Sequence, residues 1–380
     1  MSRLIEYWTD IEDDNLSHVD KMSHFLQSEF GELGADRIWS PEYFKWKLGC
    51  CNPAGKGYVS LAMVGEQVVG SISLTKKRIL IDGKECLGAE IGDSYSSVSI
   101  RRRGKPLHLS KLDVNPKSYI NRSVFGRLVS DVQRRAERDG VSVIYGSPNV
   151  NSYAGYTKNL NFIDADWCNN VQFIRPTCSY FKKRYASLRF LTPIFQIIEK
   201  VLVLTHSGIY SRFLNRGVVF ECALPSEEMI NDLWGRLKPV LGFSLIRDAS
   251  YWSYRYINHP IFKYSFFKIY KNNILEGIVV TRLHVANNGR KIVSIAEWLV
   301  EDGIKFDFIL LEIVNHYRKS SVDYFNFWAD KSSKEGNAAK RSLFFTRQKI
   351  PIIFSSIGNS RLFLSKKPKI EVYLGNTDNV

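Results

Sequence analysis

One series of elements occurs twice in this chain of 380 residues, and the repeat constrains the fold more than any other feature. An aromatic segment that stops before a proline begins each series, at residues 43–48 and again at residues 251–256. Three strands separated by turn signals follow each segment, and then come a helix and a further strand. The shared order and turn positions indicate a duplicated α+β unit rather than a chance likeness between two units.

The turns within the two series use similar residues. Asp82-Gly83-Lys84 and Asn287-Asn288-Gly289 suit tight hairpins, because Gly and Asn adopt positive φ more readily than other residues. The predicted strands are 58–64, 67–81, 85–94 and 141–147 in the first series, and 264–270, 274–285, 291–300 and 322–328 in the second. The predicted helices are 123–139 and 306–319.

Length and hydropathy divide the chain further. A chain of 380 residues is too long to fold around one hydrophobic core of ordinary size. We therefore predict domains at residues 1–178 and 216–380, joined by a helical linker at residues 179–215. The most apolar stretch, residues 188–204, contains Pro193 and three charged residues, whereas a spanning helix needs about 20 apolar residues. An amphipathic connector is the favoured interpretation, and a helix lying on a membrane surface is the alternative.

The net charge of +15 predicts an anionic partner. The basic residues are spread along the chain, which favours a solvated surface and phosphate-bearing ligands over a nucleic-acid stripe. The six cysteines lack metal-ligand spacing and are expected to be buried, reduced thiols, and the first 14 residues lack an apolar signal core. We therefore expect a cytoplasmic protein without a metal, nucleic-acid partner or integral membrane segment, either a monomer or a homodimer.

A loop of small residues opens the helix predicted at residue 123. Asn121 and Ser123 flank Arg122, and Val124 and Phe125 begin the helix. Backbone N–H groups at the start of a helix point outward, and the helix dipole favours a negative charge there. The loop therefore predicts a pyrophosphate site.

The strand and loop after this helix carry a more specific pattern. Its sequence is Ile144-Tyr145-Gly146-Ser147-Pro148-Asn149-Val150-Asn151-Ser152, and it is followed by Tyr156, Lys158 and Phe162. Together with Gly92-Asp93-Ser94-Tyr95, it resembles the acyl-CoA signature of the GNAT superfamily, and more narrowly the two-domain sugar N-acyltransferases that act on dTDP-linked amino sugars. The pattern departs from the superfamily at Asn121 and Ser123, where the loop normally carries glycine, and in an apparent insertion at residues 97–116.

The resemblance implies an α+β fold of tandem GNAT-like domains, each a mostly antiparallel mixed sheet flanked by helices. It implies transfer of an acyl group from acyl-CoA to the amine of a nucleotide-linked amino sugar, such as dTDP-3-amino-3,6-dideoxyhexose. The acyl group is acetyl or a short hydroxyacyl such as 3-hydroxybutanoyl, and the product serves surface polysaccharides such as O-antigen and lipopolysaccharide. No Gly-x-Ser-x-Gly elbow or placed Cys/His pair is present, which is consistent with direct attack by the amine.

Three residues are candidates for the chemistry. The resemblance implies that Tyr156 protonates the leaving thiolate, whereas a core tyrosine is the alternative. Asp93 and Glu90 precede the CoA loop, where such enzymes often place a base. Because side chains alternate along a strand, we expect only one of them to face the site, and we choose Asp93. A turn-capping role for Asp93 is the alternative.

Further candidates concern binding. We expect the loop residues 121–125 to hold the pyrophosphate, and Asn149 and Asn151 to meet the pantetheine amides, with turn capping as the alternative for both asparagines. His108, in the inserted segment, is a weaker candidate base or acceptor contact. The second half has no comparable loop, so we expect it to have lost CoA binding and to complete the acceptor cleft through Glu297 and Trp298. A buried core strand explains these two residues as well.

Two other functions remain open at this point. An aminoacyl-tRNA-dependent transferase of the peptidoglycan type also has tandem domains of this fold and would explain the charge through RNA binding. The absence of a long helical arm and the fairly complete CoA segment argue against it. The second alternative is a non-catalytic module whose altered CoA site serves regulation.

Overall fold

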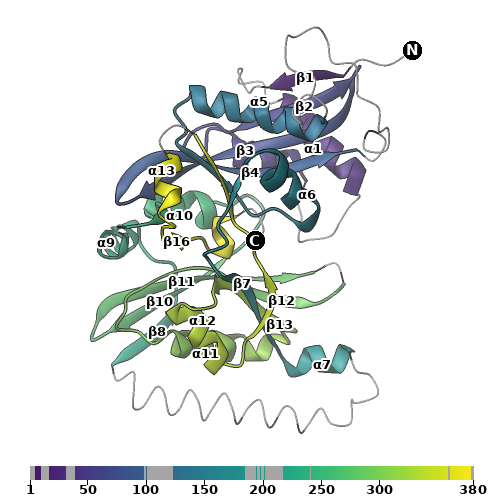
Figure 1. Ribbon diagram of the computed structural model, residues 1–380. Helices are drawn as coiled ribbons and strands as arrows, with labels where there is room; N and C mark the ends of the chain where they lie inside the picture. Colours follow the sequence, from purple (N-terminus) through teal and green to yellow (C-terminus); the bar gives the residue numbers. More distant parts are fainter. Residues whose placement is uncertain are drawn as a thin grey trace.

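A computed structural model of the chain describes residues 5–9, 17–30, 39–97, 100, 123–184, 194, 197, 201, 217–239, 241–286, 288–357 and 360–377. These residues form two lobes, each built around one sheet with helices packed against it (Figure 1). Both sheets are mostly antiparallel and contain parallel pairs, as the sequence predicts.

The first sheet has the strand order β1-β2-β3-β4-β5-β15-β6. Its strands from the first half are β1 (Glu6–Thr9), β2 (Tyr58–Val64), β3 (Gln67–Ile81), β4 (Lys84–Ser96), β5 (Val143–Gly146) and β6 (Ile163–Asp164). The helices of this half are α1 (Ser17–Phe30), α2 (Pro41–Leu48), α5 (Val124–Arg138) and α6 (Val150–Ala154), which continues into the π-helix η1 (Gly155–Asn159).

The second sheet has the order β14-β7-β13-β12-β11-β10-β8. Its strands are β7 (Asn170–Pro176), β8 (Val218–Cys222), β10 (Ser265–Lys271), β11 (Ile274–Val285), β12 (Lys291–Val300), β13 (Tyr324–Asp330) and β14 (Phe345–Lys349). The helices are α7 (Cys178–Arg184), α9 (Glu227–Leu237), α10 (Ala249–Trp252), η4 (Ser253–Ile257), α11 (Phe306–His316), η5 (Tyr317–Ser320), α12 (Lys334–Arg341), α13 (Ser360–Ser365) and η6 (Leu374–Asn376).

The repeat predicted from the sequence is present in the structure. Strands β2, β3, β11 and β12 have the predicted bounds. The hairpin turn after β3 places Asp82 and Gly83 at φ values of 47° and 74°, which its residue types favour. In each half, the third strand of the series pairs in parallel with the strand after the helix through three residue pairs. These pairs join β4 to β5 at residues 88–90 and 143–145, and β12 to β13 at residues 292–294 and 324–326. The two halves therefore share one topology.

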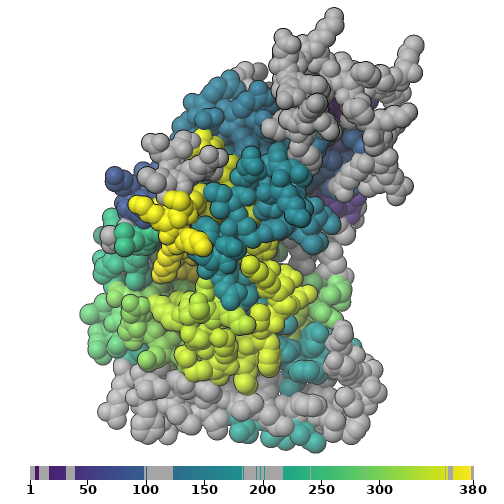
Figure 2. Space-filling model, viewed as in Figure 1, coloured from purple at the N-terminus to yellow at the C-terminus, as the bar shows by residue number. Residues whose placement is uncertain are grey.

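The two halves also exchange strands. β7, from the first half of the sequence, lies between β13 and β14 in the second sheet. β15 (Ile353–Ser356), from the end of the sequence, lies between β5 and β6 in the first sheet. Figure 2 shows teal residues from the first half of the sequence next to yellow and yellow-green residues from its end where the lobes meet. Each sheet thus depends on both halves of the chain, and the domain bounds proposed from the sequence remain a prediction.

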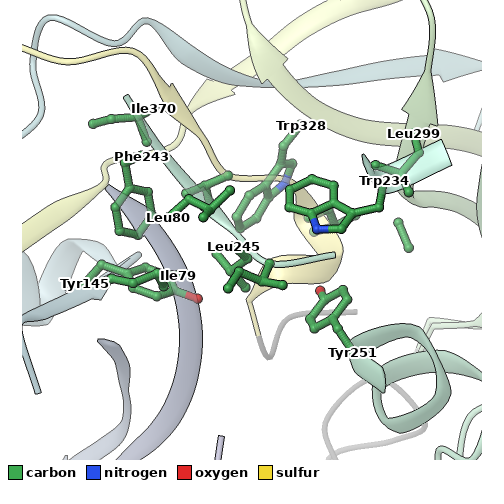
Figure 3. Packing of buried hydrophobic residues seen from close by; sticks show 14 of the residues in the cluster. Ile79, Leu80, Tyr145, Trp234, Phe243, Leu245, Tyr251, Leu299, Trp328 and Ile370 are labelled. Atoms are coloured by element: carbon green, nitrogen blue, oxygen red, sulfur yellow. The ribbon is translucent and has the colours of Figure 1, made fainter. Parts of the chain in front are cut away.

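A shared hydrophobic core joins the lobes. Ile79, Leu80 and Tyr145 of the first half pack with Trp234 and Phe243 of the second (Figure 3). Two short strands from the second half extend this contact, since β9 (Phe243–Leu245) pairs with β3 and β16 (Ile370–Glu371) pairs with β9. A core that crosses the junction fixes the lobes relative to each other, because separating them would expose large aromatic side chains to water.

The structure also tests the predictions for the cysteines and for a membrane-spanning segment. All six cysteines are free thiols, but Cys50, Cys51 and Cys222 are exposed, so the expectation that all are buried is wrong. Most of the basic insertion 97–116 and most of the apolar connector 188–204 lie outside the described residues. Among the helices that are described, none is both long and apolar enough to cross a bilayer.

Candidate active site

Strands β4 and β5 pair and then separate, and a cavity opens between them. Their parallel pairing ends at Glu90 and Tyr145, beyond which β4 continues along β3, while β15 pairs with the other edge of β5 over residues 143–146. The cavity has a volume of about 340 Å³. Part of its lining comes from the ends of the two strands and from the segment that follows β5: Glu90, Ile91, Gly92, Asp93, Ser94, Ser147, Pro148, Asn149, Ser152 and Tyr156.

A glycine allows the strands to lie close together just before they separate. A Cβ at Gly146 would lie 2.7 Å from Cγ2 of Ile91 and 3.1 Å from its carbonyl oxygen. Any side chain at residue 146 would therefore push β5 away from β4 and change the mouth of the cavity.

A β-bulge in β4 places two carboxylates on this cavity. Asp93 and Ser94 stand opposite the single residue Ile72 of β3, and Asp93 has a φ of 51°. The extra residue shifts the alternation of side chains by one position, so Glu90 and Asp93 both line the cavity. The prediction that only one of them faces the site is wrong, because it assumed an uninterrupted strand.

Each carboxylate is paired with a buried lysine. Lys47 Nζ lies 2.6 Å from Asp93 Oδ2, and Ser73 Oγ donates to the same oxygen at 2.5 Å. Lys77 Nζ lies 3.1 Å from Glu90 Oε2. Lys47 and Lys77 are 1% and 6% exposed, so these ion pairs are shielded from solvent and hold both carboxylates in fixed positions.

Sequence reasoning missed the two lysines, although one of them carries a signal. Lys47 lies four residues after Tyr43 and three after Phe44, which places it on the buried face of α2. A lysine on an apolar helical face needs a buried anion as its partner. That pattern was sufficient to predict an internal acid for Lys47, though not to identify Asp93.

Tyr156 lines the cavity and is 2% exposed. Its ring meets Phe125 and Phe162 edge to face, with ring centroids 4.9 Å apart in both pairs. Burial raises the pKa of Tyr156 above its usual value, the negative charge of Asp93 raises it further, and a hydrogen bond with Ser94 partly opposes them. The phenol therefore holds its proton firmly at neutral pH.

The π-helix that carries Tyr156 needs a glycine at its first residue. A Cβ at Gly155 would lie 2.8 Å from Cε1 of Phe125, the ring that packs on Tyr156. The φ and ψ of Gly155 are helical, at −61° and −46°, so space and not backbone conformation imposes glycine here.

We expect Gly155→Ala to destabilise the protein by about 1 kcal/mol or more, because Phe125 must move to admit the methyl group. Gly235→Ala is the matched control, since Gly235 also lies within a helix and a Cβ there would meet no atom within 4 Å. That control should stabilise α9 by about 0.5–1 kcal/mol. The denaturant midpoints of the two variants test this prediction. Equal shifts of the same sign in both variants would contradict the steric role of Gly155.

The start of α5 lies next to this site. Ser123 caps the helix by accepting a hydrogen bond from Gly126 N at 3.2 Å, Val124 is buried and Phe125 contacts Tyr156. The first turn of α5 contains no acidic residue, which leaves its positive dipole end uncompensated within the helix. The other two predicted loop residues, Asn121 and Arg122, lie outside the described residues.

The two asparagines after β5 differ in position. Asn149 lines the cavity, and its Oδ1 accepts hydrogen bonds from Asn151 N at 2.9 Å and Ser152 N at 3.1 Å. It thus caps α6, which is the alternative considered from the sequence, while its amide nitrogen is not used by this cap. Asn151 is exposed and is not part of the cavity lining.

The proposed acceptor residues of the second half lie elsewhere. Glu297 is fully buried and accepts hydrogen bonds from Tyr251 Oη at 3.0 Å, Tyr256 Oη at 2.5 Å and Asn376 Nδ2 at 3.1 Å. The prediction that Glu297 meets a substrate is therefore wrong. The ring of Trp298 packs against that of Tyr373, with ring centroids 4.4 Å apart. Trp298 also lines a second cavity of about 950 Å³, and none of the described residues that line this cavity lines the first. His108 lies outside the described residues.

The chain itself fills part of the corresponding opening in the second half. The helix η6 packs against β12, and a Cβ at Gly375 would lie 2.2 Å from Tyr256 Oη and 2.9 Å from the carbonyl oxygen of Ala296. The second half contributes to the first cavity instead, through Phe262 and Ile353. Within the described ranges, no three His, Cys, Asp or Glu side chains gather as a metal site.

No family model and no curated protein matches this sequence. Solved structures do resemble it. A probable N-acyltransferase of unknown function from Enterococcus faecalis has a TM-score of 0.57 at 13% identity, over 93% of this chain and 73% of that one. A GCN5-related N-acetyltransferase from Anabaena variabilis has a TM-score of 0.58 at 10% identity, with the same two coverages.

A third similar structure is Saccharomyces cerevisiae N-myristoyltransferase with bound myristoyl-CoA. It has a TM-score of 0.57 at 11% identity, over 98% of this chain and 84% of that one. At such identities the likeness establishes the fold, and it confirms the tandem GNAT-like architecture predicted from the sequence.

Proposed function

We propose that this protein is an acyl-CoA-dependent N-acyltransferase whose active site is the cavity between β4 and β5. The observation that carries the proposal is the position of Tyr156, a buried tyrosine that lines a cavity where two carboxylates are also present. The tandem fold supports it, since a structure of that fold holds myristoyl-CoA. Both sequence segments that resemble the sugar N-acyltransferases, at residues 92–95 and 144–152, contribute to the cavity lining.

Acyl-CoA is the proposed cosubstrate. Its pyrophosphate would bind at the start of α5 through backbone N–H groups of residues 121–125, where the helix dipole favours an anion. Its pantetheine arm would pass the amide of Asn149 and bring the thioester to Tyr156. The net charge of +15 favours the approach of such a polyanion.

The proposed reaction is a direct transfer. The acceptor nitrogen attacks the thioester carbonyl carbon, a C–N bond forms, and the C–S bond breaks as the tetrahedral intermediate collapses. Tyr156 gives its proton to the departing sulfur, and the proton that the nitrogen loses passes first to Asp93 and from there to the Tyr156 phenolate, which restores both groups. Asp93, held by Lys47 and Ser73, is the proposed acceptor of the amine proton, and Glu90 supports the same amine from the neighbouring position.

The proposed acceptor is a nucleotide-linked amino sugar such as dTDP-3-amino-3,6-dideoxyhexose, and the acyl group is acetyl or a short hydroxyacyl. Such a reaction would take place in the cytoplasm and supply surface polysaccharide synthesis. The segments at residues 92–95 and 144–152 support this narrower proposal, because they carry the resemblance to the sugar enzymes and also form the cavity wall.

Binding of CoA tests the first half of this proposal. We expect Ser123→Trp to abolish CoA binding in calorimetry, because the indole would fill the anion site at the start of α5. Lys305→Trp is the matched control, since Lys305 is the N-cap of α11, the equivalent helix of the second half. The control should bind CoA as the wild type does. Equal binding by wild type and Ser123→Trp would move the site away from α5.

The raised pKa of Tyr156 predicts the shape of the pH profile. Because the phenol remains protonated above pH 10, an acid role for Tyr156 is not lost at alkaline pH. We expect kcat at saturating acyl-CoA to rise between about pH 6 and pH 9, as the acceptor amine loses its proton. A decline that begins below about pH 9 in a protein that remains folded would contradict this assignment.

A further inference from the structure

Five aromatic residues line the first cavity, and we call them the aromatic wall: Phe30, Trp39, Tyr43, Tyr95 and Phe262. Phe30 stacks on Trp39 with ring centroids 5.4 Å apart and an interplanar angle of 17°, and its centroid lies 4.6 Å from that of Tyr95. The hydroxyl of Tyr95 donates a hydrogen bond to Glu29 Oε2 at 3.0 Å, which holds the Tyr95 ring in place. These rings form a preformed, mostly apolar part of the cavity lining.

The groups that line the cavity suit an amine better than a phosphate. The charged side chains among its described lining residues are Glu90 and Asp93, and the lysines that pair with them, Lys77 and Lys47, are buried and are not among the lining residues. A diphosphate is normally bound by cationic side chains or helix N-termini, whereas an amine is bound by carboxylates and aromatic faces. The described part of the cavity therefore suits the amine end of an acceptor and lacks groups for its nucleotide end.

The size of the cavity agrees with this division. Its volume of about 340 Å³ is at the lower end of the roughly 300–1,000 Å³ of small-molecule sites. Such a space suits one small ring next to the end of a thioester. It is too small to enclose a base, a ribose and a diphosphate as well.

We propose that the aromatic wall selects the acceptor by packing against the apolar face of a deoxygenated ring, with the amine directed to Asp93 and Glu90 and the nucleotide outside. This inference rests on the proposed function and specifies its substrate class. The physical reason is desolvation, since a hydroxyl pressed against the wall would lose its hydrogen bonds to water without replacement. A methyl or methylene group at the same place gains contact area with the rings.

Two nucleotide-free acceptors test the proposal: a methyl 3-amino-3,6-dideoxyhexoside and its 6-hydroxy counterpart. Thiol release from saturating acyl-CoA gives KM and kcat for each acceptor. For the wild type we expect both glycosides to be acylated, with a KM about tenfold lower for the dideoxy compound. Trp39→Leu should raise the KM of the dideoxy compound about tenfold, leave kcat and the KM for acyl-CoA nearly unchanged, and abolish the preference.

Trp39→Phe is the matched control, because it keeps a ring in the stack between Phe30 and Phe44 and should retain the preference. Phe262→Leu provides a second variant, from the other half of the chain, should Trp39→Leu fail to fold. Equal KM values for the two glycosides in the wild type, or a preference that survives both leucine variants, would overturn the proposed role of the wall.

A binding measurement separates this proposal from the proposed function. Saturation-transfer NMR detects binding of the dideoxy glycoside to the wild-type protein without acyl-CoA. Binding that Trp39→Leu weakens, in a protein that releases no thiol with any acceptor, supports the wall and removes the transferase proposal. Thiol release without a preference between the glycosides removes the wall and retains the transferase. If the protein neither binds the glycoside nor releases thiol, both proposals are overturned.

Discussion

Replacement of Tyr156 by phenylalanine should lower kcat by about 100-fold or more and leave the affinity for CoA unchanged. The substitution removes one hydroxyl from a ring that is packed between Phe125 and Phe162, so the shape of the cavity is kept. What is lost is the proton that the leaving sulfur needs, and general acids contribute about 10²–10⁴-fold to such reactions. The hydrogen bond between the phenol and Ser94 is lost as well.

Single-turnover thiol release measures this effect without interference from product release. Tyr153→Phe is the matched control, because Tyr153 lies one turn earlier, donates to Asp164 Oδ2 at 2.5 Å and does not line the cavity. The control should keep most of the activity. A Tyr156→Phe protein with wild-type kcat would exclude this residue as the acid.

Glu297→Ala should cost about 3–5 kcal/mol of stability, the largest effect on folding that we expect from one substitution. Glu297 is fully buried, accepts hydrogen bonds from two tyrosines and Asn376, and lies 3.7 Å from Arg247 Nε. Its removal leaves several buried donors without their shared acceptor and leaves Glu371 as the remaining carboxylate beside Arg247, which costs more than the hydrogen bonds alone are worth.

Denaturant unfolding compares this variant with Glu137→Ala, an exposed position on α5 that should change stability by less than about 0.5 kcal/mol. Glu297→Gln should fall between the two, because its amide oxygen still accepts hydrogen bonds but carries no charge. Wild-type stability for Glu297→Ala would show that the network around η6 does not hold the C-terminal segment in place.

Local patterns explain what the sequence could predict. The turns at Asp82-Gly83 and at Asn272-Asn273, where both asparagines have positive φ, are specified by their own residues, so β2, β3 and β11 were placed to the residue. The lining residues of the cavity near Tyr156 followed from one continuous segment, residues 144–156, that carries the family resemblance. Elements that depend on neighbours in sequence were therefore predictable.

Long-range pairing explains what could not be predicted. β15 reaches the first sheet from about 200 residues away, and no local signal says which strand it joins. The bulge at Asp93 depends on the register against β3, and the burial of Glu297 depends on a C-terminal segment that packs against β12. The aromatic wall combines residues from α1, the loop before α2, α2 itself, β4 and the second half, so it exists only in the folded chain.

Thiol release from a panel of acyl-CoAs, with and without dTDP-linked 3-amino and 4-amino dideoxysugars, tests the central claim most directly. We predict release that depends on the amine, with the acylated amine as the second product, and the productive pair would identify both substrates. Calorimetry of CoA on the same preparation completes the measurement. Clear CoA binding without release for any pair would contradict the transferase and favour a binding module, and a protein that binds no CoA would contradict the proposed site itself.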